Sequence, residues 1–87
     1  MSALHELKTW PPFFADVLSG DKSFEVRRDD RGYREGDRLR LREWTGTGYS
    51  GREAERTVVY VLRDAEQFGV RAGYVVIGLA AVPEETL

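Results

Sequence analysis

Short segments of alternating residues, separated by turn-forming residues, most constrain how this chain of 87 residues can fold. Apolar and polar residues alternate over 23–28 and 37–44, as in strands that bury one face. The segment 53–62 is rich in β-branched residues. The segment 74–82 is an apolar run between a glycine and a proline, which fits a strand buried on both faces. With residues 3–8 as a first strand, the pattern predicts five short strands.

A short helix is expected between the first two strands. Each proline of Trp10-Pro11-Pro12 biases the residue before it away from helical geometry, so the helix should begin around Pro12. Apolar side chains recur at helical spacing over 13–18, and Gly20 is placed to end the helix. The remaining segments read as turn chemistry over 29–36, a hairpin loop over 45–51 and an irregular stretch over 63–73.

The strand and helix pattern predicts a single, mainly β domain over 1–87, with an acidic tail from about residue 83. Closure into a small barrel would remove exposed strand edges, so we expect a barrel. Periodicity by itself fits an SH3-like barrel or an OB-like barrel equally well.

The composition excludes several kinds of site. The chain has no cysteine, which excludes disulfides, thiolate zinc sites and a cysteine nucleophile. Its one histidine, His5, excludes a His-rich metal site and is expected to be a partly buried ring hydrogen-bonded to the backbone. The acidic residues do not cluster at ligand spacing, so we predict no metal and no cofactor. No apolar stretch is long enough to span a bilayer, and we expect a soluble, cytoplasmic protein.

The charge is uneven along the chain. The formal net charge is −2, yet residues 22–42 carry eight basic and five acidic residues. Binding a long duplex needs many phosphate contacts, so an acidic chain with one arginine-rich segment better fits a short ligand such as a nucleotide or a few unpaired bases. Arg38, Arg40 and Arg42 are interpreted as a solvated strand face, with a phosphate track as the alternative.

Four residues around the second strand could carry chemistry. Lys22 stands at the corner between helix and strand, where an ammonium can reach a phosphate, although an exposed turn lysine is the ordinary reading. Glu25 and Arg27 share one strand face with Ser23, and Phe24 and Val26 lie on the other. Arg27 and Glu25 could read a phosphate and a base amine, or could pair with each other. Ser23 is a conceivable nucleophile.

Three further residues are candidates for a ligand-binding cleft. Lys8 and Trp10 end the first strand and should lie opposite Lys22. Trp10 could stack on a base, or could pack as a wedge beside the two prolines. Tyr74 heads the last strand and either lines the cleft or caps the core.

The segment 20–27, Gly-Asp-Lys-Ser-Phe-Glu-Val-Arg, resembles the Gly-x-Lys-x-x-Glu-x-Arg signature of ASCH domains, a branch of the PUA-like barrels. Residues 5–11, 67–69 and 73–76 resemble the small bacterial and phage branch named domain of unknown function 3850. The resemblance covers the chain from His5 to about Leu79 and implies a PUA-like barrel of five or six strands, with a cleft between the helix and the barrel mouth.

The ASCH resemblance implies RNA binding or the processing of RNA and nucleosides. Some members are similar to amidohydrolases that act on acylated cytidine with a lysine, a threonine and a carboxylate. The lysine matches Lys22, whereas Glu25 stands where those members have the threonine, which removes the expected nucleophile.

Three functions are carried forward. The first is a binding module for RNA or a nucleotide, with a basic and aromatic cleft lined by Lys8, Trp10, Lys22, Glu25, Arg27 and Tyr74. The alternative is a small amidohydrolase of acylated cytidine, with catalytic residues Lys22, Glu25 and either Ser23 or water as nucleophile. The third is a protein-interaction scaffold with a vestigial cleft. None of the three involves a membrane or a long duplex.

Overall fold

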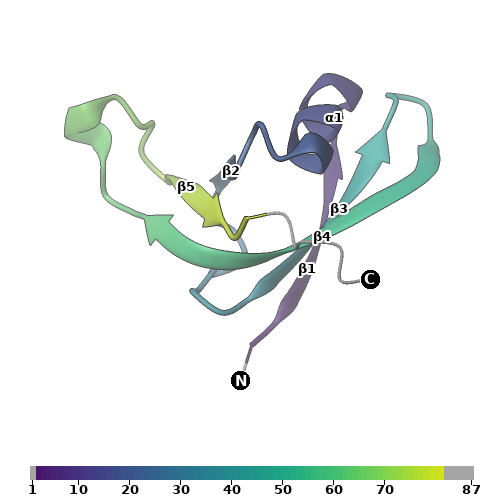
Figure 1. Ribbon diagram of the computed structural model, residues 1–87. Coiled ribbons are helices and arrows are strands. Elements are labelled where there is room, and N and C mark those ends of the chain that lie inside the picture. Colours follow the sequence, from purple (N-terminus) through teal and green to yellow (C-terminus); the bar gives the residue numbers. More distant parts are fainter. Residues whose placement is uncertain (1, 82–87) are drawn as a thin grey trace.

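One five-stranded sheet and one α-helix make up the fold over residues 2–81, the part of the chain that the computed structural model describes (Figure 1). The elements are, in chain order, β1 (Leu4–Thr9), α1 (Pro11–Ser19), β2 (Phe24–Arg28), β3 (Arg38–Trp44), β4 (Tyr49–Leu62), the short 3-10 helix η1 (Glu66–Phe68) and β5 (Tyr74–Leu79). The mainly β class and the helix between the first two strands are therefore confirmed. No helix in these described residues is long and apolar enough to cross a membrane.

The element boundaries differ from the predicted ones by one residue in β1, α1, β2 and β3, and by more in β4 and β5. The helix begins at Pro11, one residue early, and ends where Gly20 adopts a left-handed φ of 92°. β4 begins at Tyr49, so the hairpin loop is shorter than 45–51. β5 ends at Leu79, and the predicted acidic tail from about residue 83 lies outside the described residues.

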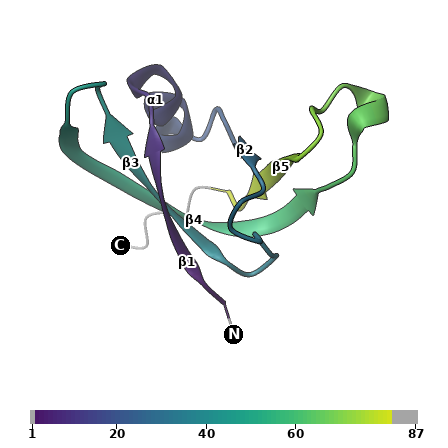
Figure 2. The ribbon, with the colours of Figure 1, turned by 180° about the vertical axis from the view of Figure 1, so that it is seen from behind.

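The long strand β4 organises the sheet, whose strand order is β1-β3-β4-β5-β2. β1 pairs in parallel with β3, and the other pairs are antiparallel. The register of β4 against β5 shifts between Val58 and Tyr60, and such a bulge bends a strand. Figures 1 and 2 show β4 running through both halves of a strongly curved sheet, with β1 and β2 left as its edges.

Arginine side chains connect these two edges. Nη2 of Arg27 donates to the backbone oxygen of Lys8 at 2.8 Å, and Nη1 of Arg31 donates to the backbone oxygen of Glu6 at 2.8 Å. Within residues 2–81 β1 and β2 form no strand pair, so side chains bridge the seam between them. We use "the seam" below for this line between β1 and β2.

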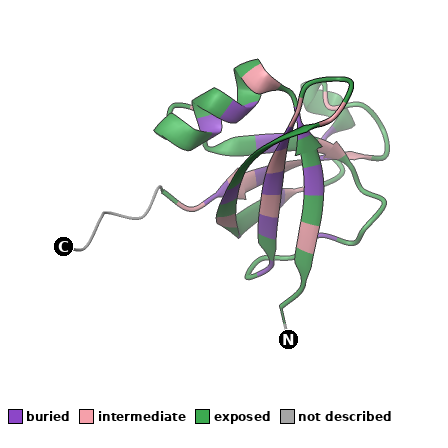
Figure 3. Cartoon of the chain, turned by 90° about the vertical axis from the view of Figure 1, so that its right-hand side faces the viewer, coloured by how far each residue is buried: buried purple, intermediate pink, exposed green. Residues whose placement is uncertain are grey.

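The core takes alternate residues from the strands of the sheet, as the banding in Figure 3 shows. Val75, Ile77 and Leu79 of β5 are buried, but the alternate residues of β5 are only half-buried, so the prediction of burial on both faces is met on one face. The helix adds Phe14 and Val17. The buried cluster comprises Leu7, Phe14, Val17, Tyr33, Leu39, Leu41, Ala54, Val58, Val61, Val75, Ile77 and Leu79.

Asp37 ties the start of β1 to the β2–β3 loop. Its buried carboxylate accepts hydrogen bonds from the backbone N–H groups of Ala3 and Arg34 and lies 2.9 Å from Nε2 of His5. Burial acts to raise the pKa of Asp37, but these hydrogen bonds outweigh it and the pKa lies below its ordinary value. His5 is partly buried as predicted, but its partner is this carboxylate rather than a backbone group.

Glu43 makes the stability of the fold sensitive to acid. Its buried carboxylate accepts from Arg52 at 2.9 and 3.0 Å and from Ser50 at 2.6 Å, and these bonds lower its pKa from 4.5 to about 2. The unfolded chain therefore binds more protons than the folded one in acid, so the stabilisation by Glu43 is complete above pH 4.5 and is lost toward pH 2.

We expect the free energy of unfolding, measured by urea titration at a series of pH values, to decrease as the pH is lowered from 4.5 toward 2. Glu43→Gln should make this dependence of stability on pH less steep. Glu53→Gln, an exposed control, should not change the slope. An unchanged slope in Glu43→Gln would contradict this assignment.

Candidate ligand-binding site

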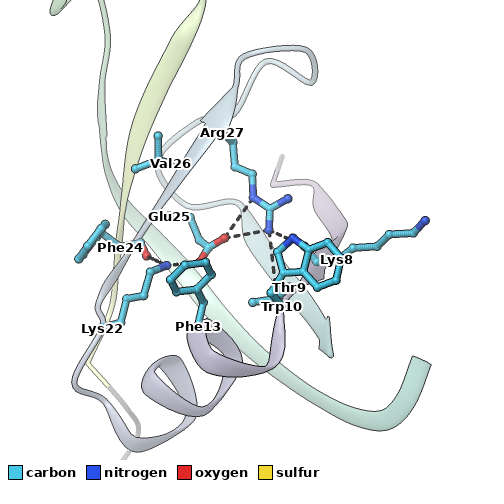
Figure 4. A pocket seen from close by; sticks show the side chains of 9 residues that line it. All are labelled: Lys8, Thr9, Trp10, Phe13, Lys22, Phe24, Glu25, Val26 and Arg27. Carbon is cyan, nitrogen blue, oxygen red and sulfur yellow. Dashed lines mark hydrogen bonds and ion pairs between the residues drawn. The ribbon is translucent and has the colours of Figure 1, made fainter. Parts of the chain in front are cut away.

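A cavity of about 440 Å³ opens where the end of β1, the start of α1 and the edge strand β2 meet (Figure 4). Such a volume is within the range of small-molecule sites. The lining combines aromatic rings with charged groups, and it consists of Lys8, Thr9, Trp10, Phe13, Lys22, Phe24, Glu25, Val26 and Arg27.

A buried carboxylate lies between two cations at this cavity. Glu25 is 3% exposed, and its Oε2 accepts from Nζ of Lys22 at 2.6 Å. Its Oε1 accepts from Nε and Nη2 of Arg27 at 3.1 and 2.9 Å. The spacing Lys-x-x-Glu-x-Arg thus gives a triad with a formal charge of +1. A buried carboxylate is stable only when paired in this way.

Lys22 is held at several points. The backbone turns after α1 at the left-handed Gly20, and the N–H of Lys22 donates to the oxygen of Asp16 at 2.9 Å. Its ammonium also donates to the backbone oxygen of Phe24 at 2.7 Å. That ammonium lies 4.9 Å from the ring centroid of Phe24 and 5.6 Å from that of Phe13. The charge is therefore fixed between two aromatic faces at the cavity wall.

Trp10 lines the cavity with a half-exposed indole. A Cβ added at Gly46 would lie 3.3 Å from Cζ3 of Trp10, so the tip of the β3–β4 hairpin touches this ring. The ring is thus packed on the hairpin and also accessible at the cavity, and its stacking on a base stays a prediction.

Lys8 lines the cavity, but its ammonium points away from Glu25 and Lys22. It lies 4.1 Å from the ring centroid of Trp44, and Figure 4 shows the side chain running away from Glu25 and Lys22. Lys8 contributes its backbone oxygen, which accepts from Arg27. The sequence places Lys8 at the cavity, but the structure directs its charge elsewhere.

Tyr74 and Ser23 lie outside this cavity. Tyr74 lines a separate cavity of about 290 Å³ beside Asp29 and Arg63, because β5 pairs its first residue with the far end of β2. Ser23 is exposed, and neither residue is among those that line the larger cavity. The structure therefore brings together Trp10, Lys22, Glu25 and Arg27, with the backbone of Lys8, and leaves these two apart.

Sequence reasoning missed four lining residues: Thr9, Phe13, Phe24 and Val26. Phe13 and Phe24 are apolar residues in predicted elements, and such residues are ordinarily assigned to the core. Both are about half-exposed. Their closeness to Lys22 in the sequence, nine and two residues, could have indicated that these two rings lie beside its ammonium.

The arginines of β3 are ion-paired on the outer face. Arg40 contacts Glu55 and Glu6 at 2.9 Å, and these bonds raise its pKa. Arg42 contacts Glu53 at 3.0 Å, and Arg38 lies 3.5 Å from Glu55. This arrangement fits the solvated strand face rather than a phosphate track.

Residues 2–81 contain no group of three or more histidine, aspartate or glutamate side chains placed to hold a metal ion. The absence of a metal and of a cofactor stays a prediction.

Comparison with known proteins shows the family of the chain. Residues 4–79 match the model of the family called domain of unknown function 3850, so the chain belongs to that family. A protein of Escherichia phage P2, named as an uncharacterized 12.9 kDa protein in the GpA 3′ region, is 39% identical over 61 residues. The match covers 70% of this chain and 56% of the phage protein, so the chain spans little more than half of that relative.

Proposed function

We propose that this chain is a binding module for a nucleotide or for RNA, and that the cavity between α1 and β2 is its site. The observation that carries the proposal is the triad of Lys22, Glu25 and Arg27, whose net positive charge is fixed against aromatic rings. A nucleotide offers the two complementary groups, because its phosphate is an anion and its base has a flat aromatic face.

The geometry gives each lining group a role in this proposal. Lys22 has donated two of its three N–H groups to Glu25 and Phe24, and the third remains for a phosphate oxygen. Trp10, Phe13 and Phe24 supply ring faces for a base. Glu25 accepts three hydrogen bonds from the two cations, and its role in this proposal is to position them rather than to read a base amine.

We also propose that the curved sheet is a PUA-like barrel of the ASCH type. The Gly-x-Lys-x-x-Glu-x-Arg spacing supports this, since it places its Lys, Glu and Arg in one ion-paired cluster at the cavity. The seam, bridged by Arg27 and Arg31, would be where the barrel closes through side chains. The cytoplasm, the location we expect from the composition, contains both classes of ligand.

The hydrolase alternative has weaker support. Its predicted nucleophile Ser23 does not line the cavity, which leaves water as the nucleophile. The scaffold alternative predicts that no nucleotide binds at all. Both are outcomes of the following test.

We expect Lys22→Ala to weaken binding of cytidine monophosphate by about 5- to 150-fold, because a charge-assisted hydrogen bond contributes about 1–3 kcal/mol. Lys22→Arg should keep most of the affinity, since it keeps the charge. Titration calorimetry on the wild type and the variants measures this.

Lys8→Ala is the matched control, because it removes a nearby ammonium that lies over Trp44 instead of the cavity. Equal losses in Lys8→Ala and Lys22→Ala would contradict the site. No binding by the wild type would favour the scaffold. Release of the acyl group from acylated cytidine, lost in Lys22→Arg with binding intact, would favour the hydrolase.

A further inference from the structure

A second cavity lies beside the proposed nucleotide site, along the seam. Its volume is about 150 Å³, and Arg27 lines both cavities. The lining of the second cavity consists of Leu7, Arg27, Arg28, Asp30, Arg31 and Tyr33. Without Lys8, whose ammonium lies over Trp44, the two cavities are lined by four cationic and two acidic residues, in a chain whose net charge is −2. The positive charge is thus concentrated at this seam.

Several N–H groups along the seam have no acceptor in the described residues 2–81. Arg27 uses Nε and Nη2 for Glu25, Lys8 and Thr9, which leaves Nη1. Arg31 uses Nη1 for the oxygen of Glu6, and its Nε lies 3.9 Å from the exposed carboxylate of Asp30, which leaves Nη2. Arg28 makes no ion pair within that part of the chain; its guanidinium carbon lies 5.9 Å from the ring centroid of Tyr74. Arg27 is paired with Glu25, so Arg28 and the loosely paired Arg31 carry the charge that is left for a ligand. The arginines of β3 are matched more closely, each by a glutamate at 2.9 to 3.5 Å.

The backbone of β1 sets the spacing of the two bridging arginines. Arg27 binds the oxygen of Lys8 and Arg31 binds that of Glu6, two residues earlier on the same strand edge. A strand rises about 3.3 Å per residue, so the two anchoring oxygens are about 7 Å apart. This spacing is similar to that between neighbouring phosphates of an extended single strand. The arginines are also held in place before any ligand binds, which lowers the entropic cost of binding.

We propose that the seam binds two successive nucleotides of a single strand. One base and its phosphate occupy the larger cavity at Lys22 and Arg27, and the next phosphate binds at Arg28 and Arg31. This inference rests on the proposed function, since it extends the same site. The ligand is then a single-stranded oligonucleotide rather than a mononucleotide, because only a chain with repeated phosphates can place one phosphate at each cavity.

The test compares cytidine monophosphate with the 5′-phosphorylated dinucleotide of cytidine, by titration calorimetry at several salt concentrations. We expect the dinucleotide to bind at least tenfold more tightly to the wild type. Its log affinity should fall with log salt by about 0.7 more than that of the mononucleotide, since one more phosphate is neutralised. Arg28→Gln with Arg31→Gln should reduce dinucleotide affinity about tenfold and leave mononucleotide affinity unchanged.

Arg38→Gln is the matched control, because it removes an arginine from the ion-paired face. It should leave both ligands unaffected. If Arg31→Gln lowers the thermal stability, the single variant Arg28→Gln is used instead, because Arg28 does not bridge the seam. A loss of dinucleotide affinity in Arg28→Gln then supports the proposal. Equal affinity for the two ligands, or equal loss of both in the double variant, would overturn the two-nucleotide seam while leaving the mononucleotide site. If the mononucleotide does not bind or ignores Lys22→Ala, the proposed function fails and the seam with it.

Discussion

Glu25→Ala should destabilise the fold by about 3–5 kcal/mol, because it removes the shared partner of two largely buried cations. The side chains of Lys22 and Arg27 are 17% and 24% exposed, so water replaces only part of the lost pairing. Domains of this size are stable by about 5–15 kcal/mol, and the loss is therefore a large part of the total. Urea unfolding of the variant at neutral pH measures it.

Two further variants separate the causes of this loss. Glu25→Gln keeps the volume and removes the charge, so a loss of similar size would assign the effect to charge rather than to a cavity. Glu53→Ala removes an exposed carboxylate that contacts Arg42, and it should change the stability by less than about 1 kcal/mol. A Glu25→Ala variant as stable as Glu53→Ala would show that the triad does not hold the site together.

The ion pairs of Glu25 also determine how Glu25→Gln should affect ligand binding. A carboxylate that reads a base amine would alter base preference when it becomes an amide. Here both oxygens of Glu25 accept from Lys22 and Arg27. We therefore expect Glu25→Gln to loosen both cations and to lower the affinity for all four bases alike. Glu25 and Arg27 pair with each other, as one of the two interpretations of this strand face has it, and phosphate binding by Arg27 stays a prediction.

Local sequence rules predict the elements of this fold well. The Trp10-Pro11-Pro12 segment and Gly20 set the ends of α1 because their constraints act within one or two residues. Alternation over 37–44 places Leu39 and Leu41 in the core as expected. These features depend on interactions between residues close together in the sequence, so the sequence is enough to predict them.

The pairing of strands depends on contacts that are distant in the sequence. Nothing in residues 3–8 indicates that β1 pairs in parallel with β3 instead of closing onto β2. Tyr33 lies in a turn segment, and yet it is among the most buried side chains, because its ring packs in the core and against the ring of His5, 28 residues earlier in the chain. Phe24 and Val26 are 44% and 53% exposed while Glu25 is buried, since β2 is an edge strand whose inner face holds the triad.

The residues of the site could be predicted where they lie within one sequence motif. They could not be predicted where the direction of a side chain depends on contacts that are distant in the sequence. Lys22, Glu25 and Arg27 lie close together in the sequence and meet through strand periodicity. The ammonium of Lys8 goes to Trp44, a residue of a strand that pairs with β1 only in three dimensions. Tyr74 is carried away from the cavity by the register of β5 against β2.

Phe13 and Phe14 are adjacent in α1 and should separate stability from binding. Phe14 is 0% exposed in the core, whereas Phe13 is 51% exposed and lines the cavity beside Lys22. We expect Phe14→Ala to lower the free energy of unfolding by about 3–5 kcal/mol, because it removes a buried ring and leaves a void. Phe13→Ala should lower it by less than about 1 kcal/mol, since its ring already contacts water.

The order reverses for ligand affinity. Loss of a stacking face costs about 1–3 kcal/mol per base, so Phe13→Ala should weaken binding of cytidine monophosphate by about 5- to 150-fold. Phe14→Ala should leave the affinity of the folded fraction close to that of the wild type, because its ring does not line the cavity. Urea unfolding and calorimetry on the same two proteins check both halves. If Phe13→Ala binds like the wild type while Trp10→Ala loses affinity, the base stacks on the indole, and Phe13 serves only to flank the ammonium of Lys22.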